Sequence, residues 1–280
     1  MEQELDYERI LMIKTAWYYY MENYTQQHIS ELLGISRIRV IKLLDKARQT
    51  EIIQFKLRQD NDYRMQMERR LISAFGLKDA FVVPSVADSN TNENIARAAA
   101  MYIGNRLDEN SFINMGYGDT LSRVLNHLAT AVERPLSVVS LTGGVNYYLP
   151  NTQSSVFNAK LYLMPTPLLV SSAEMVTAMN QEPTVQEIRN LIPLSRMAVI
   201  GIGALGKDAT ILKSGILRES DFLQLTIQGA VGDVLCHFLD KDGNLVETNV
   251  EDRLMATSLE ALRQLDNVIG VAAGLSKVTA

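Results

Sequence analysis

The sequence predicts an α/β protein in which a small helical domain precedes a larger, three-layer α/β domain. Near the start of the chain, two short helical patterns meet at Gly34. From Ala80 onward, short apolar or β-branched runs alternate with helical patterns, and this alternation indicates parallel strands joined by helices. A polar stretch at 58–62 separates the two regions. The predicted parts are a first domain at 1–58, a linking helix at 59–78 and an α/β domain at 79–280.

Each of the two short helical patterns has a start signal and an apolar side. Thr25 precedes the first and Ser36 precedes the second, and each hydroxyl can accept a hydrogen bond from the free N–H groups of a starting helix. The apolar side of the first pattern comprises Ile29, Leu32 and Leu33, and that of the second comprises Val40, Leu43, Leu44 and Ala47, which fall at i, i+3, i+4 and i+7.

The segments on either side complete a predicted winged domain. Upstream, Leu5–Met21 has a helical pattern with Ile10, Ile13 and Trp17 on one side. Downstream, Glu51–Leu57 is a strand-like run of the kind that forms the β element of a wing.

The second short helix has a basic side that differs from its apolar side. Arg39, Lys42 and Lys46 share one stripe, and Arg37 lies at the helix start. A helix that is held by one face, basic on another and preceded by a helix and a glycine turn is typical of a helix-turn-helix lying in the major groove of DNA. The alternative is an ordinary helical hairpin with a solvated charged face. The N-terminal position and the flanking segments favour DNA binding.

The composition limits the classes of protein. Hydrophobic residues make up 47% and charged residues 21% of the chain, as in soluble globular proteins. The net charge of −5 argues against coating nucleic acid with the whole surface, but not against a local basic helix. No apolar run approaches the roughly 18 residues that span a membrane, and the single cysteine, Cys236, fits a reducing cytoplasm. The scattered histidines suggest no metal site, and we expect no cofactor.

The remaining elements follow in order. Residues 61–75 form the predicted linking helix, closed by Gly76. The predicted strands of the α/β domain are Ala80–Val83, Phe112–Met115, Leu136–Leu141 and Met197–Ile202, and the predicted helices between them are Glu93–Leu107 and Thr120–Ala131.

Glycine-bearing turns mark where a ligand would bind, because ligands of open α/β sheets lie beyond the carboxyl ends of the strands. These turns are Met115–Thr120, Leu141–Val145, Gly201–Gly206 and Gly229–Asp233. The third matches G-x-G-x-x-G by its letters, yet its place late in the chain and the missing strand before the expected acid argue against a dinucleotide fold.

The turns offer groups for a phosphate and for a sugar. Adjacent glycines, such as Gly143 and Gly144, let backbone N–H groups converge on an anion. Thr142 can add a hydroxyl, and Lys277 can add a compact positive charge. The other candidates are Gly203 in the third turn and, for sugar hydroxyls, Asp119 and Asp233. Taken singly, each feature is more often a plain turn or a helix cap. Together they favour a sugar-phosphate site.

The chain also resembles a known family. The pattern TQxxIsxxLGISRxxVxKLLxxAR is followed by LTGGV, VIGIGA, GAVGDVLCHFLDKDG and GVAAGLSK. This order resembles the SorC/DeoR-type family of bacterial sugar-responsive transcriptional regulators, and the similarity covers nearly the whole chain. It implies a winged helix-turn-helix followed by an effector domain related to the sugar-phosphate isomerase and glucosamine-phosphate deaminase fold. It also implies a homotetramer, a dimer of dimers, that leaves its operator DNA when a phosphorylated sugar or a phosphorylated autoinducer binds.

The resemblance assigns roles to particular residues. Those expected at the DNA are Tyr19 and Gln26 on the backbone and Arg37, Arg39 and Lys42 on the recognition helix. Those expected at the effector are Gly143, Gly144 and Lys277 on the phosphate and Asp119 and Asp233 on the sugar. The family pattern continues with a further helix and strand after the position of Lys277, whereas this sequence ends at Ala280. Cys236 and His237 stand where small or aromatic residues are common, and we expect them to pack in the core.

The expected function is a non-enzymatic regulator, a repressor of a carbohydrate or autoinducer uptake or catabolic operon. One rival is a sugar-phosphate isomerase or deaminase with a DNA-binding appendage, in which Asp119 and Asp233 serve as acid and base. Against it, neither His127 nor His237 has an acid nearby by motif. Another rival is an activator that responds to an unphosphorylated sugar.

Overall fold

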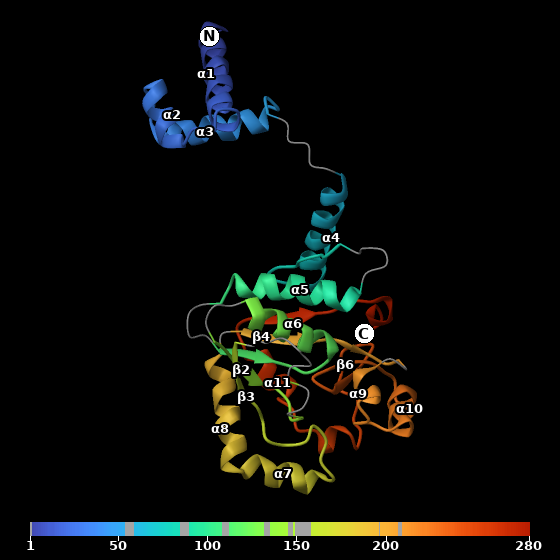
Figure 1. Cartoon of the computed structure of the whole chain (residues 1–280). Helices are drawn as coiled ribbons and strands as arrows, with labels where there is room; N and C mark the ends of the chain where they lie inside the picture. Colours follow the sequence, from blue (N-terminus) through green and yellow to red (C-terminus); the bar gives the residue numbers. More distant parts are fainter. Residues whose placement is uncertain are drawn as a thin grey trace. The chain divides into compact units, whose positions relative to one another are not determined.

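The computed structural model describes residues 2–53, 59–84, 90–107, 112–131, 135–144, 148, 158–195, 197–206 and 209–280. The chain divides into two compact units, Met1–Val82 and Val83–Ala280. The helices of the first unit, coloured blue to teal in Figure 1, are α1 (Glu2–Tyr20), α2 (Gln26–Leu33), α3 (Arg37–Gln49) and α4 (Gln59–Phe75). In the described part of the chain, no helix has the length and apolar character needed to cross a membrane.

The first unit confirms the two short helices and corrects the segment around them. The sequence-predicted apolar stripe of α3 is buried along its whole length. On α2, Ile29 is fully buried, whereas Leu32 is 52% exposed and does not belong to the core. Residues 51–53 form a turn and a bend rather than a strand, and Glu51 has a φ of 57°. The rest of the predicted wing, 54–57, lies outside the described residues.

The core of the first unit uses a different side of α1 from the one that the sequence suggested. Leu11, Met12 and Ala16 pack with Leu43 and Ala47 of α3. Thr15 is also buried, and its hydroxyl donates to the Leu11 carbonyl at 2.7 Å. The stripe that contains Ile10, Ile13 and Trp17 is exposed instead.

The second unit is built on a parallel sheet. Its spatial order is β3-β2-β1-β4-β8, and every neighbouring pair is parallel. The strands are β1 (Phe112–Met115), β2 (Leu136–Ser140), β3 (Ala159–Tyr162), β4 (Met197–Gly201) and β8 (Val268–Val271). An antiparallel sheet, not predicted from the sequence, has the order β5-β6-β7 and consists of β5 (Gly203–Ala204), β6 (Ala230–Val234) and β7 (His237–Asp240).

Helices cover both faces of the parallel sheet, because successive strand residues point to opposite faces. Val138 and Val199 pack on one side with residues of α5 and α6, whereas Val139 and Ala198 pack on the other with Ile192 beyond α8. Figure 1 shows α5 and α6 on one side of the sheet and α8 on the other. The helices of this unit are α5 (Thr91–Gly104), α6 (Asp119–Ala131), α7 (Ala173–Gln181), α8 (Pro183–Leu191), α9 (Thr210–Lys213), α10 (Glu219–Ile227) and α11 (Leu259–Arg263). The short 3-10 helices are η2 (Ile192–Leu194), η3 (Glu251–Arg253) and η4 (Leu275–Lys277).

One predicted strand is wrong. The segment Ala80–Val83 has no strand partner among the residues that the structure describes. The Val82 N–H instead donates to the Glu68 carboxylate of α4 at 2.8 Å. The segment is apolar and β-branched, as strands are, but sequence propensity alone does not supply a neighbouring strand.

Candidate DNA-binding and effector sites

The turn between α2 and α3 has the local chemistry that the sequence predicted. Thr25 Oγ1 accepts from the His28 N–H and Ser36 Oγ accepts from the Arg39 N–H, each at 3.2 Å. Gly34 adopts a φ of 64° and a ψ of 32°, the left-handed conformation that ends α2, and its N–H donates to the Glu31 and Ser30 carbonyls. Thr25 and Gly34 therefore set the two ends of α2, and Ser36 sets the start of α3.

The basic residues of α3 fall into two groups. Lys46 Nζ lies 3.1 Å from the Glu8 carboxylate of α1, and Arg48 pairs with Asp45. Arg37, Arg39 and Lys42 are exposed, and none of them has an ion pair among the residues that the structure describes. Arg37, Arg39 and Lys42 can therefore bind an external anion without first breaking an ion pair. Lys46 and Arg48 are partly neutralised by Glu8 and Asp45.

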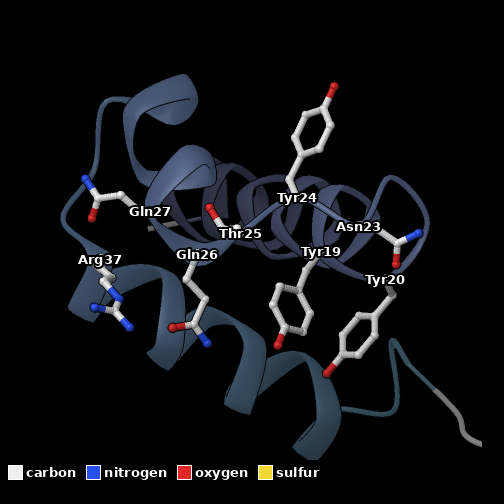
Figure 2. A pocket seen from close by; sticks show the side chains of 8 residues that line it. All are labelled: Tyr19, Tyr20, Asn23, Tyr24, Thr25, Gln26, Gln27 and Arg37. Atoms are coloured by element: carbon white, nitrogen blue, oxygen red, sulfur yellow. The ribbon is translucent and has the colours of Figure 1, made fainter.

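A hollow of about 740 Å³ opens beside the start of α2. Figure 2 shows that Tyr19 of α1, Gln26 of α2 and Arg37 of α3 all line it. Tyr19 and Tyr20 meet edge to face, with ring centroids 4.9 Å apart. The hollow thus joins a cation, an amide and phenol groups at the N-terminus of a helix, a combination that suits a phosphate.

Arg39 and Lys42 line a different hollow, together with Glu8, Lys46 and Leu43. The candidate DNA residues are therefore distributed over two neighbouring faces of the first unit. Both faces include residues of α3, so one docking of this helix can present both to a nucleic acid.

In the second unit, the carboxyl ends of the parallel strands meet at one edge. Asp119 follows β1, Thr142 follows β2, Gly203 follows β4 and Lys277 follows β8. The chain runs from β1 to β2 and β3 on one side and then returns to place β4 on the other side of β1. The edge between β1 and β4 is therefore the topological switch point, where open α/β sheets bind ligands.

Asp119 begins α6 and is held by two neighbours. Its carboxylate accepts from Arg123 Nε at 3.1 Å and from Asn92 Nδ2 of α5 at 2.9 Å. Burial acts to raise the pKa of Asp119, but the hydrogen bonds from Arg123 and Asn92 outweigh it and lower the pKa below its usual value. The carboxylate is thus ionised and oriented, ready to accept from a hydroxyl group.

Asp233, Gly203 and Lys277 form the other half of this edge. Gly203 of β5 pairs with Asp233 of β6, and a Cβ at position 203 would overlap the Asp233 carboxylate. Burial raises the pKa of Asp233, although the Cys236 N–H donates to its carboxylate at 3.1 Å. Burial also lowers the pKa of Lys277, against the charges of Asp233 and Asp119. Asp119 and Asp233, expected at one site with Lys277, are thus close enough to this lysine to interact with its charge.

Lys277 is half-buried and, within the described residues, makes no salt bridge. Burial lowers the pKa of Lys277. An anion bound beside the ammonium group would favour its charged form and raise this pKa.

The turn after β2 works differently from our expectation. The Gly143 N–H donates to the Met255 carbonyl and the Gly144 N–H donates to the Thr166 carbonyl, each at 2.7 Å. These N–H groups are therefore already used and do not converge on an anion. Gly143 is needed for close packing instead, since a Cβ there would run into the Pro167 carbonyl.

Thr142 is likewise occupied. It is buried, and its hydroxyl lies 2.8 Å from the Tyr148 hydroxyl. Tyr148 in turn donates to the Met115 carbonyl at 3.1 Å. The Thr142 hydroxyl is therefore, like the Gly143 and Gly144 N–H groups, already hydrogen-bonded within the protein.

Two histidines have acid partners that sequence reasoning missed. His127 Nε2 lies 2.7 Å from Glu93, and His237 Nδ1 lies 2.8 Å from Glu251. His237 is buried, as expected of a core residue, and its Nε2 lies 2.9 Å from the Thr257 carbonyl. Burial acts to lower the pKa of His237, but the hydrogen bond and charge of Glu251 outweigh it and raise the pKa. The partners lie 14 or more residues away along the chain, so no local spacing could have revealed them.

Comparisons with known proteins agree with this architecture. Residues 60–280 match the family model described as a putative sugar-binding domain. The transcriptional regulator LsrR of Klebsiella pneumoniae subsp. pneumoniae is 33% identical over 277 residues, which cover 98% of this chain and 86% of the relative. LsrR of Enterobacter sp. (strain 638) is 31% identical with the same coverage. Among solved structures, the full-length sorbitol operon regulator SorC from Klebsiella pneumoniae aligns with 95% of this chain and 89% of its own, at 23% identity and a TM-score of 0.66, a likeness of fold.

Proposed function

The chain belongs to the SorC/DeoR-type family of sugar-binding transcriptional regulators, and on this premise we propose that it is a repressor released from its operator by a phosphorylated effector. The operon would serve uptake or breakdown of a carbohydrate or an autoinducer. The effector would be a phosphorylated sugar or the phosphorylated autoinducer. The site of action would be the cytoplasm.

The first unit would act as a winged helix-turn-helix with α3 as the recognition helix. The observation that carries this proposal is a group of exposed cations, Arg37, Arg39 and Lys42, on a helix whose opposite side is buried. Within the described chain these three cations have no ion pair. Tyr19 and Gln26 would contact the DNA backbone from the hollow beside α2. Phosphate contacts would position the unit, and α3 would read base edges.

The second unit would bind the effector at the carboxyl edge of its parallel sheet. Lys277 would neutralise the phosphate, and Asp119 and Asp233 would accept from the hydroxyl groups of the sugar. Gly203 would leave room for Asp233, while Thr142 with Gly143 and Gly144 would form the wall of the site. This division of roles follows from the hydrogen bonds that already occupy the wall.

Effector binding would change DNA affinity through the assembly, which we propose to be a dimer of dimers. An effector shifts a conformational equilibrium only by as much as its affinities for the two states differ. The state released from DNA must therefore hold Asp119, Asp233 and Lys277 in the arrangement that binds the effector better.

A gel-shift titration tests the proposal. The operator duplex is bound at fixed salt, and phosphorylated tetroses, pentoses, ketohexoses and the phosphorylated autoinducer are added in turn, each beside its unphosphorylated form. One phosphorylated ligand should release the DNA and its unphosphorylated form should not. Release by the unphosphorylated form would overturn the role of Lys277, and DNA affinity unchanged by every compound would overturn the gating.

The rival class, a sugar-phosphate isomerase or deaminase, is tested with the same compounds. In this rival function Asp119 and Asp233 would serve as acid and base, and burial raises the pKa of Asp233. Turnover of any of these compounds by the purified chain, lost in Asp233→Asn, would establish an enzymatic function.

A further inference from the structure

Helix α1 has a second apolar side that the first unit leaves uncovered. Its members are Tyr7 (63% exposed), Ile10 (47%), Ile13 (46%), Trp17 (55%) and Met21 (63%), which follows the helix directly. We name these five residues the α1 stripe. At 100° per residue they span an arc of about 120°. The exposed Lys14 lies within the same arc, where its aliphatic stem can pack beside apolar neighbours. Single exposed apolar residues are ordinary, but five that share one side of a helix mark a contact surface.

The α1 stripe faces away from the core of the unit. By helical geometry, the buried side of α1 around Leu11, Met12 and Ala16 is centred about 170° from the middle of the stripe. That buried side packs against α3. Contact through the stripe would therefore leave the basic side of α3 free for DNA.

The spacing of the α1 stripe places its members on one side of the helix. From Tyr7 to Met21 the steps are three, three, four and four residues, an average of 3.5. An average step near 3.5 keeps these side chains on one side of the helix, where they can pack against a partner helix. The partner that this pattern fits is another helix with an apolar row.

The area of the α1 stripe is sufficient for a second copy. From the exposed fractions, the five side chains present roughly 600 Å² in one chain, so a symmetric pair would bury roughly 1,200 Å². A specific interface needs about 1,000 Å² in total. An isologous contact also uses the same stripe twice, so that no further apolar surface is required.

We propose that the α1 stripe is the contact between the DNA-binding units of two copies of this chain. This contact is inferred from the exposed apolar residues of α1 and does not depend on the proposed function. Its consequence rests on the proposed function: two α3 helices would be held at a fixed separation and would read two half-sites of one operator, one helical turn or a multiple of it apart.

Trp17 reports directly on the proposed contact, because it is the single tryptophan of the chain. In the full-length protein without DNA, its emission should be that of a shielded indole and should shift to the red in Tyr7→Glu, a member of the stripe that is ten residues from Trp17 and so not its neighbour on the helix. The matched control is Arg9→Glu, an exposed position of α1 outside the stripe. Circular dichroism melting should show that both variants are folded. An emission unchanged by Tyr7→Glu would overturn the proposal.

Cross-linking identifies the partner. Ile13 lies near the middle of the stripe, so Ile13→Cys should form a disulfide-linked dimer under mild oxidation, while Arg9→Cys should not. The native Cys236 is buried and serves as the common background. If Trp17 is shielded but Ile13→Cys gives only monomers, the stripe covers another part of its own chain and the proposal is wrong. A dimer linked at position 13 in a protein that fails to bind the operator would support this contact and overturn the DNA-binding function instead.

Discussion

Salt-dependent DNA binding offers a sharp test, because α3 contains two kinds of cation. Arg37, Arg39 and Lys42 are exposed without an ion pair in the described chain, whereas Lys46 is paired with Glu8 at 3.1 Å. Each phosphate contact contributes about 0.9 to the slope of log affinity against log salt. Over a rise from about 50 to about 200 mM salt, one contact is therefore worth a factor of about 3.5, and three contacts a factor of about 40.

The assay is operator binding across this salt range for single alanine variants. Arg37→Ala and Lys42→Ala should each reduce the slope by about 0.9 if they contact phosphates. If Arg39 reads a base, Arg39→Ala should keep the slope of the wild type and lose preference for the operator over random DNA. Lys46→Ala is the matched control, with a smaller loss because Glu8 already neutralises it. An equal loss for Lys46→Ala, or slopes that no variant changes, would refute the reasoning.

Further predictions address the turn, the effector site and the buried ion pair. Gly34→Ala should cost about 1 kcal/mol in thermal unfolding because of the positive φ alone, since a Cβ there meets nothing within 4 Å, and Gly34→Asn should cost less. Asp119→Asn should weaken effector binding by calorimetry about tenfold or more and leave operator affinity without effector unchanged; equal effects on both would contradict its role. Gly143→Ala should destabilise the second unit by on the order of 3 kcal/mol, because its Cβ meets a backbone carbonyl; a melting temperature equal to that of the wild type would refute this. The raised pKa of His237 means that its pair with Glu251 contributes fully to stability just below about pH 6.5, where the imidazole is charged and the carboxylate still ionised, and that this contribution is lost as the pH rises through the folded-state pKa of His237. Urea unfolding should therefore show a deficit of Glu251→Gln at about pH 6 that shrinks as the pH is raised, and a deficit that grows between about pH 6 and higher pH would contradict the sign.

Local signals identified the elements but not all of their partners. The sequence alone predicted the caps at Thr25 and Ser36, the turn at Gly34 and the strand Phe112–Met115, because each depends on groups within a few residues. The same reasoning placed a strand at Ala80–Val83, which pairs with no strand in the described part of the chain. The β-propensity of a segment describes which conformations its residues allow, whereas strand pairing also requires a neighbouring strand.

The candidate sites divide in the same way. The sequence by itself determined that α3 is basic and that aspartate, glycine and lysine residues follow strand ends, since these are matters of composition and spacing. Only the tertiary structure decided that Asp233 lies against Gly203, that the Gly143 N–H is already bonded, and that α1 buries Leu11 rather than Trp17. The physical reason is that hydrogen bonds and burial across tens of residues depend on how elements pack, and a helix with two apolar sides carries no local sign of which side faces the core.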